Sequence, residues 1–136
     1  MDRKPTNPKD AIGSDKIPLH LFPPAATALG SLGLLHGALK YGPWNWRGAG
    51  VRMSIYLDAM QRHLAKLQEG EDEDEESGLP HLSHILACAA ILADAQMAGM
   101  CNDDRPPAVG FLDWFSSLTP HVARLKALHA APRRRR

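Results

Sequence analysis

The chain of 136 residues is 44% hydrophobic and carries a formal net charge of +1 at pH 7. This length suits one domain that buries a core, although a domain of this size often gains further burial by forming oligomers. The two cysteines, Cys88 and Cys101, exclude a disulfide framework, and the polar start MDRKPTNPKDA lacks the apolar region of a secretory signal, so we expect a cytoplasmic protein.

Residues 1–20 are expected to form an extended arm without regular structure. Prolines and a glycine interrupt this stretch among charged side chains, and these residues disfavour helices and strands. Lys16 of this arm is free to reach over a bound ligand.

A first helix is predicted from about Pro23 to Lys40, because prolines suit a first turn and leucines repeat along one side. Three glycines at helical spacing lower its helix propensity, so we expect another helix to approach closely there. The apolar stretch 21–39 is long enough to suggest a membrane span, but its prolines, glycines and histidine favour a buried helix and no membrane partner.

The sequence KYGPWNWRGAG then ends this helix. Trp44, Asn45, Trp46 and Arg47 lie together in it, and such side chains can stack on a base and hydrogen-bond its edge. Alternatively, the two tryptophans plug the end of the core. The sequence leaves both interpretations open.

A second helix is predicted over about 52–68, with one apolar stripe and His63 at its edge. Asp58 and Arg62 fall on the opposite side of this helix. They can serve a site only if another helix or another subunit covers them. The alternative is an exposed ion pair between the two, which would stabilise the helix by about 0.2–0.5 kcal/mol.

Seven of the fifteen acidic residues fall within positions 69–76. Crowded carboxylates repel one another unless cations neutralise them, so this run is either a solvated loop or a site for divalent metal ions. The helical segments on both sides bring Asp58, Arg62, His63, Ser77 and His81 to its ends, which favours the metal site.

A third helix is predicted from just after Gly78 to about Met100, and its two apolar sides indicate a central position in a bundle. His81, His84 and Cys88 share one face and could bind zinc. However, a structural zinc site takes four ligands, and no second pair of cysteines or histidines accompanies these three. Core histidines, or a histidine that assists the carboxylate site, are favoured instead.

Two short helices are predicted within about 109–130, because Thr119 and Pro120 are typical of a cap followed by a first-turn proline. The basic tail, residues 132–136, is expected to be disordered, and nucleic acid is not expected as a partner.

Three blocks of sequence carry a family resemblance: NPKDAIGSDKIPL, KYGPWNWR, and RHL followed by GEDEDEESGLPHLSH. Over residues 5–100 the chain resembles the phage dATP/dGTP diphosphohydrolase N-terminal family, and within it MazZ-type enzymes of the MazG-like all-α NTP pyrophosphatases. The resemblance implies an all-α bundle of about four to five helices. It also implies hydrolysis of a purine deoxynucleoside triphosphate to the monophosphate and pyrophosphate, with dGTP preferred over dATP or 2-amino-dATP.

The MazG-like pattern has an ExxE motif on one helix and an ExxD motif on the next, which together face shared magnesium ions. Glu71 and Asp74 have the ExxD spacing, and Asp58 stands where the last acid of the first motif would be. An isoleucine occupies the place of the first acid. The metal site must therefore be completed from elsewhere, by Glu75, by Glu76 or by a neighbouring subunit.

The resemblance further implies about two or three Mg²⁺ or Mn²⁺ ions per site and a homodimer or homotetramer. The metal ligands implied are Asp58, Glu71, Asp74 and Glu75, and the catalytic residues are Glu71 and Glu76, with Glu76 as the base. The substrate-binding residues implied are Lys16, Lys40, Asn45, Trp46, Arg47, Arg62, His63 and His81.

Two other classes of protein remain as alternatives, and a third is nearly excluded. An HD-type triphosphohydrolase needs a His-Asp dipeptide, and aspartate follows none of the seven histidines. A non-catalytic helical adaptor or a zinc-stabilised binding module would explain the helices, but neither gives a reason for the acidic run beside Asp58, Arg62 and His63.

Overall fold

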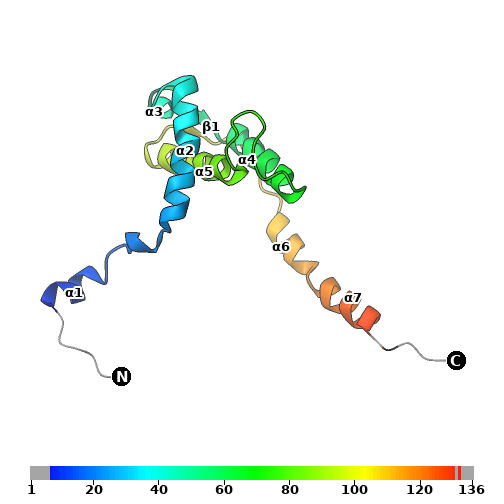
Figure 1. Ribbon diagram of the computed structural model, residues 1–136. Helices are drawn as coiled ribbons and strands as arrows, with labels where there is room; N and C mark the ends of the chain where they lie inside the picture. The colour runs from blue at the N-terminus through cyan, green and yellow to red at the C-terminus, as the bar shows by residue number, and fades with distance from the viewer. Residues whose placement is uncertain (1–6, 131, 133–136) are drawn as a thin grey trace. The chain divides into compact units, whose positions relative to one another are not determined.

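The computed structural model describes residues 7–130 and residue 132, and the chain divides into two units, residues 1–104 and 105–136. Helices dominate both units (Figure 1), which confirms the all-α prediction. In chain order the elements are α1 (Pro8–Gly13), the 3-10 turn η1 (Leu19–Leu21), α2 (Pro24–Tyr41), α3 (Asn45–Ala49), β1 (Val51–Arg52), α4 (Met53–Gln68), α5 (His81–Met97), β2 (Cys101–Asn102), α6 (Phe111–Ser117) and α7 (Pro120–Ala130).

The prediction that the N-terminal arm lacks regular structure is wrong for part of its described residues. The side chain of Asn7 accepts a hydrogen bond from the backbone N–H of Lys9 and caps α1, and Pro8 occupies its first turn. A proline that breaks the interior of a helix is well suited to begin one. Lys16 lies exposed after this helix. Residues 1–6 of the arm, and residues 131 and 133–136 around the basic tail, lie outside the described residues.

The core of the first unit forms where α5 packs against both α2 and α4 (Figure 1). The prediction that the third helix is central is therefore confirmed. The parallel strands β1 and β2 tie the start of α4 to the segment after α5, with Val51 paired to Cys101. The buried apolar side chains of this core are Trp46, Val51, Met53, Leu92 and Ala95.

Two glycines of α2 allow the close approach to α5 that the sequence predicts. A Cβ at Gly33 would overlap the carbonyl oxygen of Ser83 and lie 2.9 Å from the Cβ of Ala87, and a Cβ at Gly30 would lie 3.3 Å from that of Leu86. Gly37 is different, because a Cβ there would meet no described atom within 4 Å. The close contact therefore spans the middle of α2 and not its last turn.

The second unit contains the two short helices that the sequence predicts. Helix α6 ends at Ser117 and α7 begins at Pro120, so the break falls at Leu118 and Thr119 and the proline lies in the first turn of α7. Phe111 stacks on Phe115 within α6, with ring centroids 5.5 Å apart.

None of the helices that the structure describes, α2 included, is long and apolar enough to cross a membrane.

Candidate functional site

The acidic run forms a closed loop between α4 and α5 that backbone hydrogen bonds hold in place. The N–H of Asp74 donates to the carbonyl of Leu79 at 2.7 Å, and the N–H of Gly78 donates to the carbonyl of Asp74 at 2.7 Å. The N–H of His81, the first residue of α5, donates to the carbonyl of Asp72 at 2.9 Å. These bonds fix which carboxylates turn inward, so the run is not merely a string of solvated charges.

Asp74 is the acid of this loop whose side chain is mostly buried, with 12% of it exposed. One of its oxygens, Oδ2, accepts hydrogen bonds from both the backbone N–H and the hydroxyl of Ser77, each at 3.0 Å. Burial tends to raise the pKa of Asp74, but these bonds and the nearby His84 and His63 hold it below its usual value. Asp74 is therefore an ionised carboxylate in a sheltered position.

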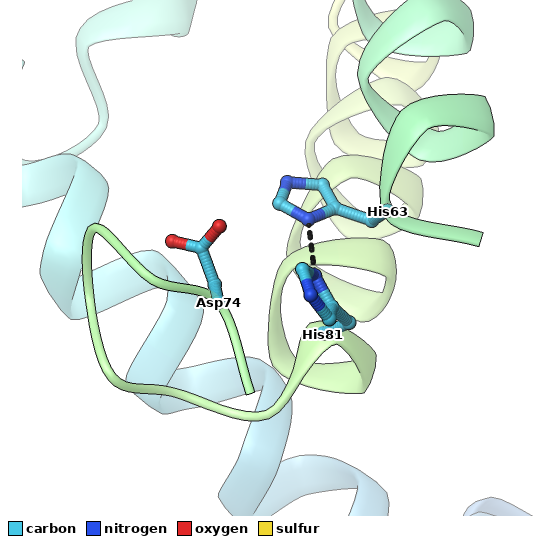
Figure 2. A group of neighbouring side chains, drawn as sticks. All are labelled: His63, Asp74 and His81. Atoms are coloured by element: carbon cyan, nitrogen blue, oxygen red, sulfur yellow. Dashed lines mark hydrogen bonds between the residues drawn. The ribbon is translucent and has the colours of Figure 1, made fainter. Parts of the chain in front are cut away.

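Four of the seven histidines gather beside this carboxylate. His63 of α4 and His81 of α5 meet through their Nδ1 atoms at 2.8 Å, with Asp74 beside them in the loop (Figure 2). The ring of His63 also stacks on that of His84, with centroids 4.7 Å apart, and His84 meets the edge of His36 from α2. Burial lowers the pKa of His63 and of His84, so both rings are neutral at pH 7.

His81 is completely buried and both of its ring nitrogens have partners. Its Nδ1 faces His63, and its Nε2 lies 2.6 Å from Oε2 of Glu71. Glu71 reaches His81 from the opposite end of the loop, ten positions earlier in the chain. The loop therefore brings a second carboxylate to the histidines, at the ring nitrogen that points away from His63.

Glu76 forms a separate ion pair at the edge of the histidine group. The ammonium of Lys40, in the last turn of α2, lies 3.0 Å from Oε1 of Glu76, and Nε2 of His36 lies 3.5 Å from the same oxygen. The hydrogen bond with Lys40 lowers the pKa of Glu76 and raises that of Lys40. Both groups are charged at neutral pH, and both side chains keep access to solvent.

Of the residues that the structure describes, the group able to offer one metal-ligand atom each within 4.8 Å is His63, Asp74 and His81. Asp58 is exposed on α4 and no described side chain pairs with it, so the exposed Asp58–Arg62 ion pair considered from the sequence does not form. Glu75 is exposed in the loop. The assignments of Asp58 and Glu75 as ligands stay predictions, and the described geometry draws neither residue into this group.

The loop after α2 contributes Trp46 to the core, and Trp44 and Trp46 both line a cavity. Trp46 is 9% exposed, so the interpretation that a tryptophan plugs the end of the core applies to it, whereas Trp44 is 57% exposed. Trp44 adopts the left-handed backbone conformation, with φ of 59°, and its ring lies over the guanidinium of Arg47 at 4.4 Å. Such a conformation strains a bulky residue and is characteristic of functional loops.

Asp94 of α5 holds this loop, and sequence reasoning missed it. Its carboxylate accepts two hydrogen bonds from Arg47, at 2.9 and 2.8 Å, and one from Nε1 of Trp46 at 2.8 Å. These bonds, above all that from Arg47, lower the pKa of Asp94 to about 2. A signal was present, because Asp94 is the one acidic residue within α5, which is otherwise largely apolar.

A cavity of about 400 Å³ opens between α2, the tryptophan loop and α5. This volume lies in the range of small-molecule sites. Apolar and aromatic side chains line most of it, with one carboxylate at its wall. The lining residues are Ser31, Leu34, Leu35, Ala38, Pro43, Trp44, Trp46, Ala90 and Asp94.

Cys88 does not belong to the histidine group. Cys88 is partly buried, and burial raises the pKa of its thiol, so it stays protonated at neutral pH. A protonated thiol is a poor metal ligand. The zinc face of His81, His84 and Cys88 considered from the sequence is therefore not assembled as a unit, although its two histidines lie in the group.

These features define a class of helical protein in which an acidic loop closes over a group of histidines. The profile of the family described as dATP/dGTP diphosphohydrolase, N-terminal, matches residues 6–105. The chain belongs to this family, which confirms the resemblance to it. It is similar to a protein of Salmonella phage PMBT28 named dATP/dGTP diphosphohydrolase, with 39% identity over 69 residues, 51% of this chain and 23% of that protein. The match thus spans about a quarter of that relative. No solved structure matches the chain.

Proposed function

We propose that the protein hydrolyses a purine deoxynucleoside triphosphate between its α and β phosphates and releases the monophosphate and pyrophosphate. The observation that carries this proposal is the convergence of His63, Asp74 and His81 beside the Lys40–Glu76 pair. The name of the phage relative supports the substrate class, with dGTP and dATP as the nucleotides concerned. We keep dGTP as the preferred substrate, ahead of dATP and 2-amino-dATP.

A divalent cation, Mg²⁺ or Mn²⁺, would neutralise phosphate charge and increase the acidity of the attacking water. The residues present fit such an ion, because Asp74 is an ionised carboxylate that Ser77 holds in a fixed orientation. The neutral rings of His63 and His84 add no positive charge that would repel a cation.

Lys40 and Glu76 suit the binding of phosphate and the removal of a proton. Lys40 stays cationic and is half-exposed, so it can turn from Glu76 to a phosphate oxygen. Once Lys40 has turned, the freed carboxylate of Glu76 accepts the proton of the water whose oxygen bonds to the α phosphorus. The bond from the α phosphorus to the bridging oxygen then breaks, and pyrophosphate leaves. Arg62, exposed on α4, is the second phosphate-binding side chain that we propose.

The base is proposed to bind in the cavity beside Trp44. The rings of Trp44 and Trp46 line it, which suits a planar purine. Asp94 at its wall accepts the single ring N–H of Trp46, so Trp46 offers the base its ring face. Arg47 gives two of its five N–H groups to Asp94, and we propose that another contacts the base. Asn45 and Lys16 remain proposed substrate contacts.

The test is product identification after incubation with dGTP, dATP or 2-amino-dATP and Mg²⁺ or Mn²⁺. We expect the monophosphate and pyrophosphate, and we expect Asp74→Asn to lower turnover at least a hundredfold. Asp72→Asn is the matched control, because Asp72 is an exposed acid of the same loop, and within the described residues only its backbone carbonyl is hydrogen-bonded. Release of nucleoside and triphosphate, or equal losses in the two variants, would overturn the proposal.

Self-association is part of the proposal. The side chains of Leu32, Leu35 and Leu39 on α2 are 43%, 53% and 79% exposed, although the first unit buries few apolar residues. Exposed leucines along one helix are typical of an interface. We propose that a homodimer or homotetramer covers them.

A further inference from the structure

We propose that His63, His81 and Asp74 form a binding site for one transition-metal ion, with Glu71 as the residue that positions His81. The site would take Mn²⁺, Co²⁺ or Zn²⁺ in preference to Mg²⁺. This inference goes beyond the proposed hydrolysis, because it concerns the binding of an ion whether or not a nucleotide is present.

The distances between the three residues suit a shared ion. The Nδ1 atoms of His63 and His81 are 2.8 Å apart, and a ring nitrogen of each histidine and a carboxylate oxygen of Asp74 all lie within 4.8 Å of one another. Two nitrogens that each bind one ion at about 2.1 Å would lie about 3.0 Å apart at a right angle and about 3.4 Å apart at a tetrahedral angle. The rings therefore need to separate by roughly half an ångström or less. The proton shared between the two Nδ1 atoms would be released to solvent when the ion binds.

The contact between Glu71 and His81 is an independent observation that points to a ligand. Nε2 of His81 lies 2.6 Å from a carboxylate oxygen of Glu71, which is hydrogen-bond distance, and Nδ1 of the same ring faces His63. Histidines that bind metals almost always donate their other ring N–H to a carboxylate or carbonyl in this way. His81 is completely buried, so this orientation is fixed.

Asp74 is likewise held in a fixed orientation by hydrogen bonds from a neighbour. Ser77 donates two hydrogen bonds to Oδ2 of Asp74, and within the described part of the chain no hydrogen bond reaches Oδ1. A carboxylate held by one oxygen presents the other to an ion. The three ligand residues thus come from α4, the acidic loop and the first turn of α5, and each is held by a neighbour.

The ligand types decide which ion is preferred. Imidazole suits zinc, manganese, cobalt and nickel, whereas Mg²⁺ takes oxygen ligands and keeps much of its water. Three protein ligands also leave a coordination position open, as in catalytic rather than structural sites. The remaining acids of the loop are exposed, and the group of ligand atoms that converges includes none of them.

The experiment is a titration of the full chain with Co²⁺, followed by visible absorption and calorimetry, without nucleotide. We expect one Co²⁺ per chain, which millimolar Mg²⁺ does not displace. We expect His63→Gln and Asp74→Asn to raise the Kd for Co²⁺ at least a hundredfold. Glu71→Gln should raise it about ten- to a hundredfold and leave the absorption bands in place, because Glu71 acts through His81.

His36→Gln is the matched control, because His36 belongs to the same histidine group but offers no atom to the ligand set. It should bind Co²⁺ within twofold of the unaltered protein, and circular dichroism should show that every variant is folded. The proposal is overturned if the unaltered chain binds no Co²⁺, if Mg²⁺ competes at equal concentration, or if His36→Gln loses as much affinity as His63→Gln. None of these outcomes depends on whether the protein hydrolyses nucleotides.

Discussion

The contact between α2 and α5 can be tested with one pair of substitutions in the same helix. Gly33→Ala places a methyl group against the carbonyl oxygen of Ser83 and the Cβ of Ala87, whereas Gly37→Ala places it where no described atom lies within 4 Å. Alanine is a better helix former than glycine by about 1 kcal/mol, and both positions lie within α2. The gain in helix propensity therefore nearly cancels when the two variants are compared.

The difference between them then measures the close approach. Adding a methyl group to a well-packed interface costs about 1–3 kcal/mol, and the cost falls in the upper part of this range when the neighbour is backbone. We expect Gly37→Ala to raise the free energy of unfolding by about 0.5–1 kcal/mol. Gly33→Ala should lower it by up to about 2 kcal/mol.

The assay is urea denaturation of both variants. Far-ultraviolet circular dichroism follows the loss of helix and gives the free energy of unfolding. A difference of 1 kcal/mol corresponds to roughly 4–8 °C in Tm for a domain of this size, so thermal scans serve as a second measurement. The reasoning is refuted if Gly33→Ala is as stable as Gly37→Ala, because the two helices would then not be in close contact.

Two further substitutions test the proposed chemistry and the tryptophan loop. Lys40→Met should raise KM for the nucleotide about tenfold or more with a smaller change in kcat, because it removes a phosphate contact. Lys66→Met on α4 is the control. Equal KM values for the two variants would contradict the role of Lys40. Asp94→Asn should lower stability at neutral pH. Since the pKa of Asp94 is about 2 when folded and near 3.8 otherwise, the contribution of this carboxylate is present above about pH 4 and is lost as pH falls toward 2. The difference between Asp94→Asn and the unaltered protein should therefore shrink in urea titrations over that range, and a difference that stays constant would refute the assigned role.

The helices could be predicted from the sequence because their signals are local. The leucine spacing and the prolines that begin α2 and α7 depend on neighbouring residues alone, and the structure has both helices near the expected bounds. The same proline signal was misread at Pro8. There, the capping side chain of Asn7 decides between a break and a helix, and that hydrogen bond is a matter of side-chain geometry.

The site could be predicted only in part, because the direction of a side chain in a loop depends on distant bonds. The acidic run identified the loop, and the structure places Glu71, Asp74, His63 and His81 in one group. The sequence could not show that Asp74 turns inward while its neighbours stay exposed, since the bonds to Leu79 and Ser77 decide it.

The first turn of α5 contributes both to the contact with α2 and to the candidate site. Residues 81–84 at the start of α5 carry two of the gathered histidines, and the carbonyl between them, that of Ser83, is the atom that approaches Gly33. Ser83 is itself completely buried, with no described partner for its hydroxyl, so the turn has no room to shift toward α2. A side chain at residue 33 would therefore push this turn away from α2 and move His81 relative to His63. Because two ligands that share an ion tolerate only a few tenths of an ångström, the glycine contact sets the geometry of the site as well as the stability of the fold.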